Sequence, residues 1–169
     1  MASSANVEGI RWEVLSQSET ETEEWGRRLG QLLGPGDVVL LKGDLGAGKT
    51  TFARGLATGL GLKEAVTSPT FTLIHEHPGE VPLFHVDLYR LGGEAEAAGL
   101  GLEDYLYGEG VTAIEWPERA GLLIPTTHLI VRLTPAGEST RRIGFAPAGE
   151  RYDSLVAALR ASADKQGAD

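Results

Sequence analysis

One segment constrains the fold of this chain more than any other: the octapeptide Gly43–Thr50, GDLGAGKT. It matches G-x-x-x-x-G-K-[ST], a pattern in which glycines let the backbone curl so that successive N–H groups point at phosphate oxygens. The apolar run Asp37–Lys42 before it predicts a buried strand, and Lys49–Gly61 after it predicts a helix with its positive N-terminal end at the loop. The alternative is a plain glycine turn before a helix, but this strand–loop–helix context favours a phosphate site.

The residues of this loop have chemical reasons to contact a nucleotide. The Lys49 ammonium can reach the β- and γ-phosphates as a point charge, and the Thr50 hydroxyl can ligate Mg²⁺. We therefore expect ATP and Mg²⁺ as cofactors, and the absence of an N-K-x-D motif favours ATP over GTP. The residues predicted to contact the nucleotide are Asp44, Leu45, Gly46, Ala47, Gly48, Lys49, Thr50 and Thr51.

Two acidic residues end apolar runs elsewhere in the chain. Glu115 ends VTAIE and is the predicted second metal ligand, the alternative being a solvent-exposed acid at a strand end. Asp87 ends PLFHVD and is predicted to hold a metal-bound water or position the attacking one, the alternative being a cap of the next turn. Trp116 could pack at the site or in the core. A metal site of His85 and Asp87, which share a strand face, is less favoured because the loop already accounts for a metal.

The alternation of strand and helix patterns predicts an α/β fold with three layers and a mainly parallel central sheet. We expect one domain over residues 11–160, a flexible leader over 1–10 and a flexible tail over 161–169. The predicted strands are 11–16, 37–42, 71–76, 82–88, 111–115, 128–133 and 141–145. The predicted helices are 18–33, 49–61, 94–107 (broken by glycines), a short turn from Pro117, and 152–160.

The composition excludes several classes of function. The net charge of −9 makes the chain a poor candidate for holding a phosphate backbone over a broad face, so we expect any link to nucleic acid to be indirect. The lack of cysteine excludes disulfides, thiolate zinc sites and cysteine nucleophiles, and fits a reducing compartment. Because we find neither a signal peptide nor an apolar run of about 20 residues, we expect a cytoplasmic protein without a membrane partner.

Four strings in chain order resemble the TsaE family of bacterial P-loop ATPases in tRNA threonylcarbamoyladenosine biosynthesis. They are GDLGAGKTTFARG (43–55), VTSPTFTLIHE (66–76), FHVDLYRLGG (84–93) and AIEWPER (113–119). The glycine loop alone is shared by many NTPases, whereas the combination is highly specific. The resemblance runs from about residue 12 to about residue 145 and implies a three-layer P-loop NTPase fold.

The resemblance also implies an activity and partners. TsaE proteins are Mg-dependent ATP hydrolases, weak alone and expected to be activated by a complex of TsaB and TsaD. That complex modifies tRNAs reading codons that begin with A, ATP hydrolysis resets it, and tRNA is reached only indirectly through it. By motif, Lys49 and Thr50 are the phosphate and metal residues, Glu115 completes the metal site, and Asp87 is the essential acid. The γ-phosphate switch would include Thr67, Ser68 and Thr70, and Trp116 would be the aromatic beside the metal acid.

Other readings of the sequence stay open. A small-molecule kinase of the P-loop class is one alternative, although no arginine-rich lid is visible. A module that uses ATP only as a conformational ligand is another, although pure binding needs fewer carboxylates. The adenine pocket has no sharp motif, and the region 18–22 and Arg142 are candidates for it.

Overall fold

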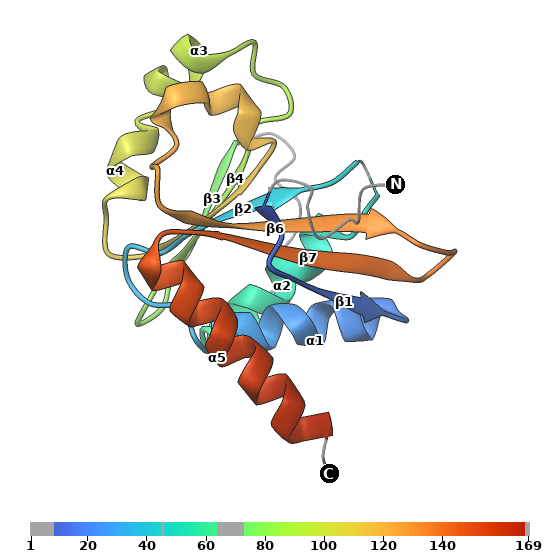
Figure 1. The fold of residues 1–169 in the computed structure, drawn as a ribbon. Helices are drawn as coiled ribbons and strands as arrows, with labels where there is room; N and C mark the ends of the chain where they lie inside the picture. The colour runs from blue at the N-terminus through green and yellow to red at the C-terminus, as the bar shows by residue number, and fades with distance from the viewer. Residues whose placement is uncertain (1–8, 45, 64–72, 168–169) are drawn as a thin grey trace.

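The computed structural model describes residues 9–44, 46–63 and 73–167, which fold around one seven-stranded mixed sheet (Figure 1). The strand order is β1-β7-β6-β2-β5-β4-β3. The strands are β1 (Trp12–Ser16), β2 (Val38–Lys42), β3 (Ile74–His77), β4 (Leu83–Asp87), β5 (Val111–Glu115), β6 (His128–Pro135) and β7 (Arg141–Ala148). The α/β class predicted from the sequence is therefore confirmed.

The prediction of a mainly parallel sheet is wrong for the two sides of the sheet. The central strands β6, β2, β5 and β4 run parallel to one another, whereas β1, β7 and β3 each pair antiparallel with a neighbour. For the β3–β4 and β6–β7 pairs, the cause is the length of the connections. Only short turns join β3 to β4 and β6 to β7, and a parallel pair needs a crossover of a dozen or more residues. The two neighbouring strands β3 and β4 thus form an antiparallel hairpin.

Helices cover both faces of the sheet, as expected for three layers. Helices α1 (Glu19–Gly30), α2 (Lys49–Gly59) and α5 (Glu150–Gly167) share an apolar cluster with one face, which we call the α2 face. Helices α3 (Glu94–Gly99) and α4 (Leu102–Leu106) and the 3₁₀ segment η2 (Pro117–Leu123) share a second cluster with the other, the α3 face. No described helix is long and apolar enough to cross a membrane.

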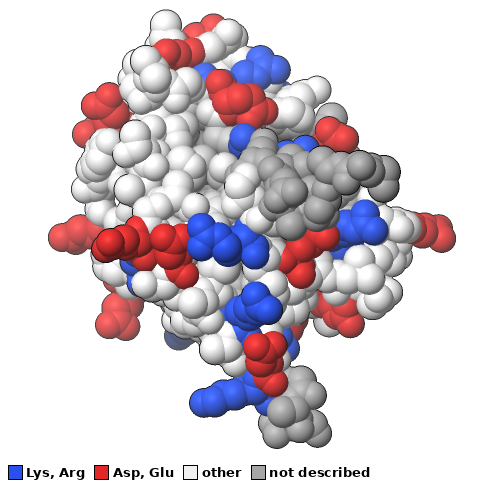
Figure 2. Space-filling model, viewed as in Figure 1, with Lys and Arg blue, Asp and Glu red and all other residues white. Residues whose placement is uncertain are grey.

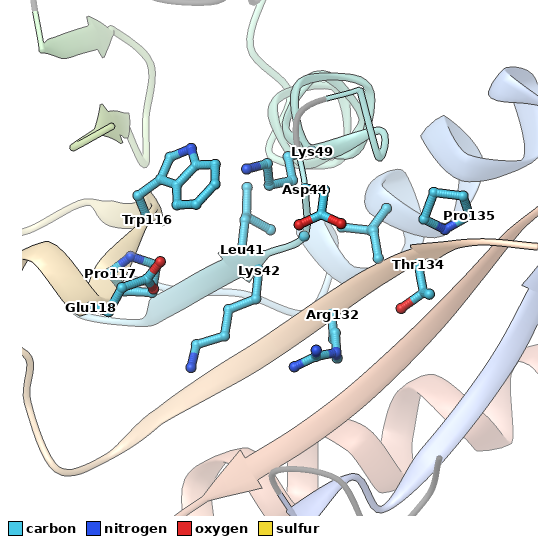
Figure 3. Close-up of a pocket in the computed structure, with 12 residues that line it drawn as sticks. Leu41, Lys42, Asp44, Lys49, Trp116, Pro117, Glu118, Arg132, Thr134 and Pro135 are labelled. Carbon is cyan, nitrogen blue, oxygen red and sulfur yellow. The ribbon is translucent and has the colours of Figure 1, made fainter. Parts of the chain in front are cut away.

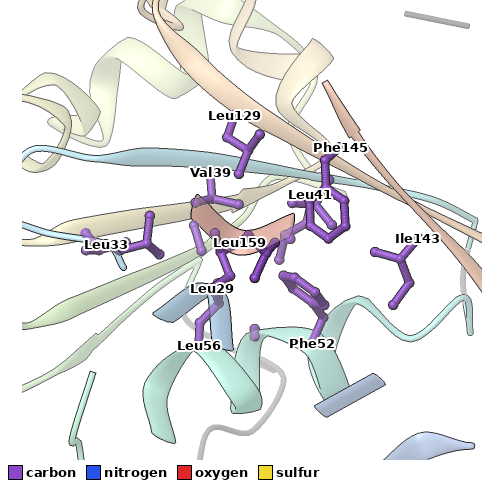
Figure 4. Packing of buried hydrophobic residues seen from close by; sticks show 14 of the residues in the cluster. Leu29, Leu33, Val39, Leu41, Phe52, Leu56, Leu129, Ile143, Phe145 and Leu159 are labelled. Atoms are coloured by element: carbon purple, nitrogen blue, oxygen red, sulfur yellow. The ribbon is translucent and has the colours of Figure 1, made fainter. Parts of the chain in front are cut away.

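Strand β2 explains why the core forms on both faces. Its run of valine and leucine alternates, so that Val39 and Leu41 enter the α2-face cluster and Val38 and Leu40 the α3-face cluster. Figure 4 shows Val39 and Leu41 among Phe52 of α2 and other buried side chains. The strand that precedes the glycine loop is therefore held from both sides, and this fixes the start of the loop.

Helices α1 and α2 approach unusually closely because each carries two glycines four residues apart. A Cβ on Gly26 or Gly30 of α1 would lie 2.3 or 2.4 Å from a backbone oxygen of α2. A Cβ on Gly55 or Gly59 of α2 would lie 2.1 or 2.2 Å from a backbone oxygen of α1. These distances are far inside van der Waals contact, so any side chain would separate the helices. The contact seats α2, and with it the residues at its N-terminus.

Several element bounds differ from the predictions. The predicted glycine break in the helix 94–107 is confirmed: two short helices flank Gly101, which has φ +73°. Helix α5 is longer at both ends than predicted, so residues 161–167, predicted as tail, are helical. Ile10, predicted in the leader, is buried and lies against Gly144. Helix α1 begins as predicted beside Ser18, whose hydroxyl caps it by accepting a hydrogen bond from the Glu21 amide at 3.1 Å.

Candidate functional site

The glycine loop runs from the end of β2 to the start of α2. Gly46 and Gly48 have φ of +80° and +103°, in the left-handed region that glycine adopts most easily. Gly43 passes close to β6, since a Cβ there would lie 2.6 Å from the carbonyl oxygen of Leu133. The loop can therefore curl tightly only with glycines at these positions. Leu45, predicted as a nucleotide contact, lies outside the described residues.

A cavity of about 630 Å³ opens beside this loop. It brings together most of the residues predicted from the sequence, from the loop, the start of α2 and the ends of β4 and β5. The predicted residues that line it are Gly46, Gly48, Lys49, Thr50, Thr51, Asp87, Glu115 and Trp116. The rest of the lining comes from the start of α1, the segment after β4, the turn between β6 and β7 and the first residue of β7: Ser18, Glu19, Thr22, Tyr89, Glu138, Ser139 and Arg141.

The remaining predicted residues lie elsewhere. Ala47, which is part of the loop, is buried, and Asp44 lines a second, smaller cavity. The predicted switch residues Thr67, Ser68 and Thr70 lie outside the described residues. Of the adenine candidates, the 18–22 region contributes to the cavity through Ser18, Glu19 and Thr22, whereas Arg142 is not among the lining residues.

The two carboxylates lie side by side at one end of the sheet. Asp87 and Glu115 pair in register on the parallel strands β4 and β5, and both face α2. Glu115 is only 4% exposed, so the alternative of a solvated strand-end acid is wrong. Asp87 is half-buried and lines the cavity while its Oδ1 accepts a hydrogen bond from the Tyr89 amide at 3.0 Å. Asp87 therefore both caps the turn and lines the cavity.

Lys49 is a buried cation at the floor of the cavity. Only 5% of the residue is exposed, and its Nζ lies 3.9 Å from Oε1 of Glu115. Burial lowers the Lys49 pKa, and the nearby carboxylates of Glu115 and Asp87 partly oppose that effect. Burial also raises the pKa of Asp87, and the Glu115 charge raises it further. The site thus holds a desolvated ammonium group that one carboxylate at 3.9 Å stabilises only in part.

Trp116 packs at the site and borders the core. It is the one residue other than glycine in the described chain with a positive φ, at 59°. Its ring lies 4.1 Å below the Lys49 Nζ and 5.0 Å from the Tyr89 ring. Figure 3 shows the Lys49 amine and the Trp116 indole pointing toward each other above β2. A left-handed tryptophan followed by proline is a costly conformation, and such conformations gather at functional sites.

Figure 3 shows residues that line the second cavity, of about 320 Å³. Lys49 and Trp116 border both cavities. Lys42 and Arg132 lie next to each other in register on β2 and β6 and line the second cavity with Asp44. A bound group in the first cavity would therefore have an adjoining space that contains charges of both signs.

Two residues of the site were not predicted. His85 is fully buried on β4, and its Nε2 lies 2.6 Å from Oε2 of Glu115. The signal for it was its two-residue spacing from Asp87. Residues two apart on a strand point to the same face of the sheet, and Glu115 at the end of β5 points to that face too. Arg141 lies in the cavity wall where Arg142 was expected, because the strand period puts Arg141 on the same face as the core residue Ile143.

Arg141 ties the β6–β7 hairpin to the glycine loop. Its Nε donates to the carbonyl oxygen of Ala47 at 3.1 Å, and its Nη2 donates to that of Gly46 at 3.3 Å. Arg142 instead lies 3.9 Å from Glu13 in a weak ion pair on β1. The loop is thus held from outside through the carbonyl groups of Gly46 and Ala47, while the Ala47 amide donates within the loop to the Asp44 carbonyl oxygen at 3.0 Å.

Surface charge on the face shown in Figure 2 is mixed. Blue and red side chains alternate over the described residues, without a continuous basic area on this face. This pattern agrees with the net charge of −9 and offers no broad surface there for a phosphate backbone.

Fold and cavity together define an α/β protein with a glycine loop, a buried lysine and two paired carboxylates at the ends of parallel strands. The family model for "Threonylcarbamoyl adenosine biosynthesis protein TsaE" matches residues 16–143. This chain belongs to the TsaE family.

Individual relatives agree with this assignment. The chain is 40% identical over 151 residues to the tRNA threonylcarbamoyladenosine biosynthesis protein TsaE of Bacillus subtilis, covering 89% of this chain and 93% of the relative. It is 42% identical over 132 residues to TsaE of Treponema pallidum, covering 78% of this chain and 98% of the relative. The crystal structure of Bacillus subtilis YdiB superposes with a TM-score of 0.77 at 36% identity, over 89% of this chain and 95% of that one.

Proposed function

We propose that this protein is a Mg-dependent ATPase with a P-loop NTPase fold that acts in tRNA threonylcarbamoyladenosine biosynthesis. Family membership supports the pathway. The single observation that carries the ATPase is the buried Lys49, which sits behind the glycine loop and beside two carboxylates at the floor of the cavity. A buried ammonium group with a lowered pKa gains most from an anion brought into that cavity.

The described residues fit ATP and Mg²⁺. The cavity of about 630 Å³ is in the usual size range for a cofactor site. The Thr50 hydroxyl and the Glu115 carboxylate are hard oxygen ligands of the kind Mg²⁺ prefers. No group of three or more described His, Asp and Glu side chains could hold a metal alone, so Mg²⁺ would need phosphate or water oxygens as well. Such shared coordination is usual for Mg²⁺ with a nucleotide.

Each residue then has a defined part in hydrolysis. Lys49 and the loop N–H groups would bind the phosphates and stabilise the charge that develops on the transferred phosphoryl group. Thr50 and Glu115 would hold Mg²⁺, which when bound neutralises charge on the phosphate oxygens. Asp87 lines the same cavity and, with its remaining oxygen, would orient the attacking water. Trp116 would keep the Lys49 ammonium in place through its ring face.

The partners we propose are TsaB and TsaD, with tRNA reached only through their complex. The mixed and acidic surface supports this indirect link, because direct tRNA binding needs clustered lysine and arginine. Hydrolysis would be weak alone, rise in the complex, and reset it between turnovers. We place the protein in the cytoplasm, where the tRNA substrates of that complex are found.

The test is phosphate release from ATP by the purified protein, with and without a TsaB–TsaD complex. We expect slow Mg-dependent release alone and a clear increase with the complex. No release under either condition would contradict the proposal. Transfer of phosphate to a nucleoside or small alcohol, in place of release, would support a small-molecule kinase, for which the second cavity beside Lys49 offers acceptor space.

A further inference from the structure

The carboxylate of Glu115 is held unevenly by its two neighbours. Its Oε2 lies 2.6 Å from Nε2 of His85, whereas its Oε1 lies 3.9 Å from Nζ of Lys49. His85 and Glu115 are both buried, so the short contact is shielded from water. A buried hydrogen bond to a charged acceptor is stronger than a neutral one and restricts the geometry of both groups. The contact with His85 therefore fixes the carboxylate through Oε2. The longer distance to Lys49 leaves Oε1 available to a further ligand.

The histidine is the donor in this contact when Glu115 is ionised, as a metal ligand is. A carboxylate only accepts, so Nε2 has to carry a proton. Nδ1 of His85 is buried without a hydrogen-bond partner among the described residues. A proton on Nδ1 would be a buried donor with no acceptor, which costs more than leaving a lone pair unused. The geometry thus favours the tautomer with its proton on Nε2, directed at Oε2.

The position of His85 in the sheet suits its side chain to orient the Glu115 carboxylate. His85 lies on β4, which is paired on both sides, with His75 of β3 and Ala113 of β5 opposite in register. Ala113 and Glu115 point to the same face of β5, so the small alanine side chain leaves room for the ring to reach Glu115. Strand positions hold such a geometry better than loop positions do.

We propose that His85 is a positioning residue that orients Glu115 for metal binding. It engages Oε2 and turns Oε1 toward the cavity that Lys49 and Thr50 line. Partners that orient a metal-binding carboxylate by hydrogen bonding typically contribute 10–100-fold to metal affinity or activity. This inference rests on the proposed function, because it takes Glu115 as a ligand of Mg²⁺.

The experiment compares three variants of the full chain. His85→Leu removes the donor while keeping the site apolar and filled, and His85→Gln returns an amide donor close to the position of Nε2. Val86→Ala is the matched control, since it truncates the next residue of the same strand on the opposite face. The readouts are Mn²⁺ affinity in the presence of ATP, by electron paramagnetic resonance, ATP affinity in EDTA, and folding by circular dichroism.

We expect His85→Leu to weaken Mn²⁺ binding by about 10–100-fold while ATP affinity in EDTA stays near the wild-type value. His85→Gln should recover most of the loss, and Val86→Ala should lose stability but keep its Mn²⁺ affinity. Unchanged Mn²⁺ affinity in a folded His85→Leu protein would overturn the proposal. If the wild-type protein itself binds no ATP, the proposed function fails instead.

Nitrogen NMR of the nucleotide-free protein provides a readout that does not depend on the variants folding. We expect His85 to be protonated at Nε2 and bare at Nδ1, with a downfield Nε2 proton. Protonation at Nδ1 with a bare Nε2 would contradict the proposed donor and overturn the inference.

Discussion

Replacing Gly55 by alanine tests how closely α2 packs on α1. That packing also positions the residues at the N-terminus of α2, for which we propose phosphate binding. Gly55 faces α1, and a Cβ there would lie 2.1 Å from the carbonyl oxygen of Glu23 and 2.9 Å from the amide nitrogen of Arg27. Both atoms belong to the α1 backbone, which cannot rotate away as a side chain can. Since non-bonded heavy atoms settle at about 3.5 Å, the two helices must separate by about 1 Å.

The expected cost follows from two opposing effects. Overpacking a close contact typically costs about 1–3 kcal/mol, and the backbone clash puts this site at the upper end. Alanine recovers about 1 kcal/mol of that cost, because it loses less conformational entropy than glycine in a helix. The net loss in the free energy of unfolding is about 2 kcal/mol, which lowers Tm by about 4–8 °C for a chain of this size.

Thermal and urea unfolding of the purified variant measure this loss. Gly99→Ala is the matched control, because Gly99 is also helical but has no atom within 4 Å of its Cβ position. We expect that control to be neutral or to raise stability by about 0.5–1 kcal/mol. Since α2 begins at Lys49, the shift in Gly55→Ala should also weaken ATP binding. A Gly55→Ala protein as stable as the wild type, or an equal loss in Gly99→Ala, would refute the close-packing argument.

Three further substitutions have expected outcomes. Glu115→Ala should abolish ATP hydrolysis, measured as phosphate release, because the proposed metal ligand is lost; wild-type release would disprove that role. Asp87→Ala should reduce kcat far more than ATP affinity, since the proposed part of this carboxylate is to orient the attacking water; equal losses of turnover and affinity would count against it. Tyr152→Phe should cost about 1–3 kcal/mol in urea unfolding, because the Val38 amide that now donates to the Tyr152 hydroxyl at 2.9 Å would be buried without a partner. No change in unfolding would argue against that hydrogen bond.

Local patterns predicted the centre of the fold well. Strand β2, the glycine loop and α2 follow from a short apolar run, a glycine cluster and an amphipathic stretch that are contiguous in the chain. The order of the strands does not follow from such patterns. The antiparallel placement of β1 beside β7 pairs two strands that lie far apart in the chain, and no local periodicity encodes that pairing.

The residues of the candidate site also divide into those that local sequence patterns predict and those that they do not. Lys49, Glu115 and Asp87 could be predicted because their chemistry is tied to motifs or strand ends. Arg141 was missed because two adjacent arginines look alike until the strand fixes which one faces α2. The sequence cannot place His85 against Glu115, since their short contact depends on the register between β4 and β5. Both residues depend on pairing across the sheet, which the sequence does not encode locally.

Calorimetric titration of the protein with ATP and Mg²⁺ tests the central claim most directly, with Lys49→Ala as the comparison. The account predicts saturable heat of binding for the wild-type protein and a loss of most of it in Lys49→Ala, because that side chain supplies the buried cation of the site. Absence of binding heat in the wild-type protein, or undiminished affinity in a folded Lys49→Ala variant, would contradict it.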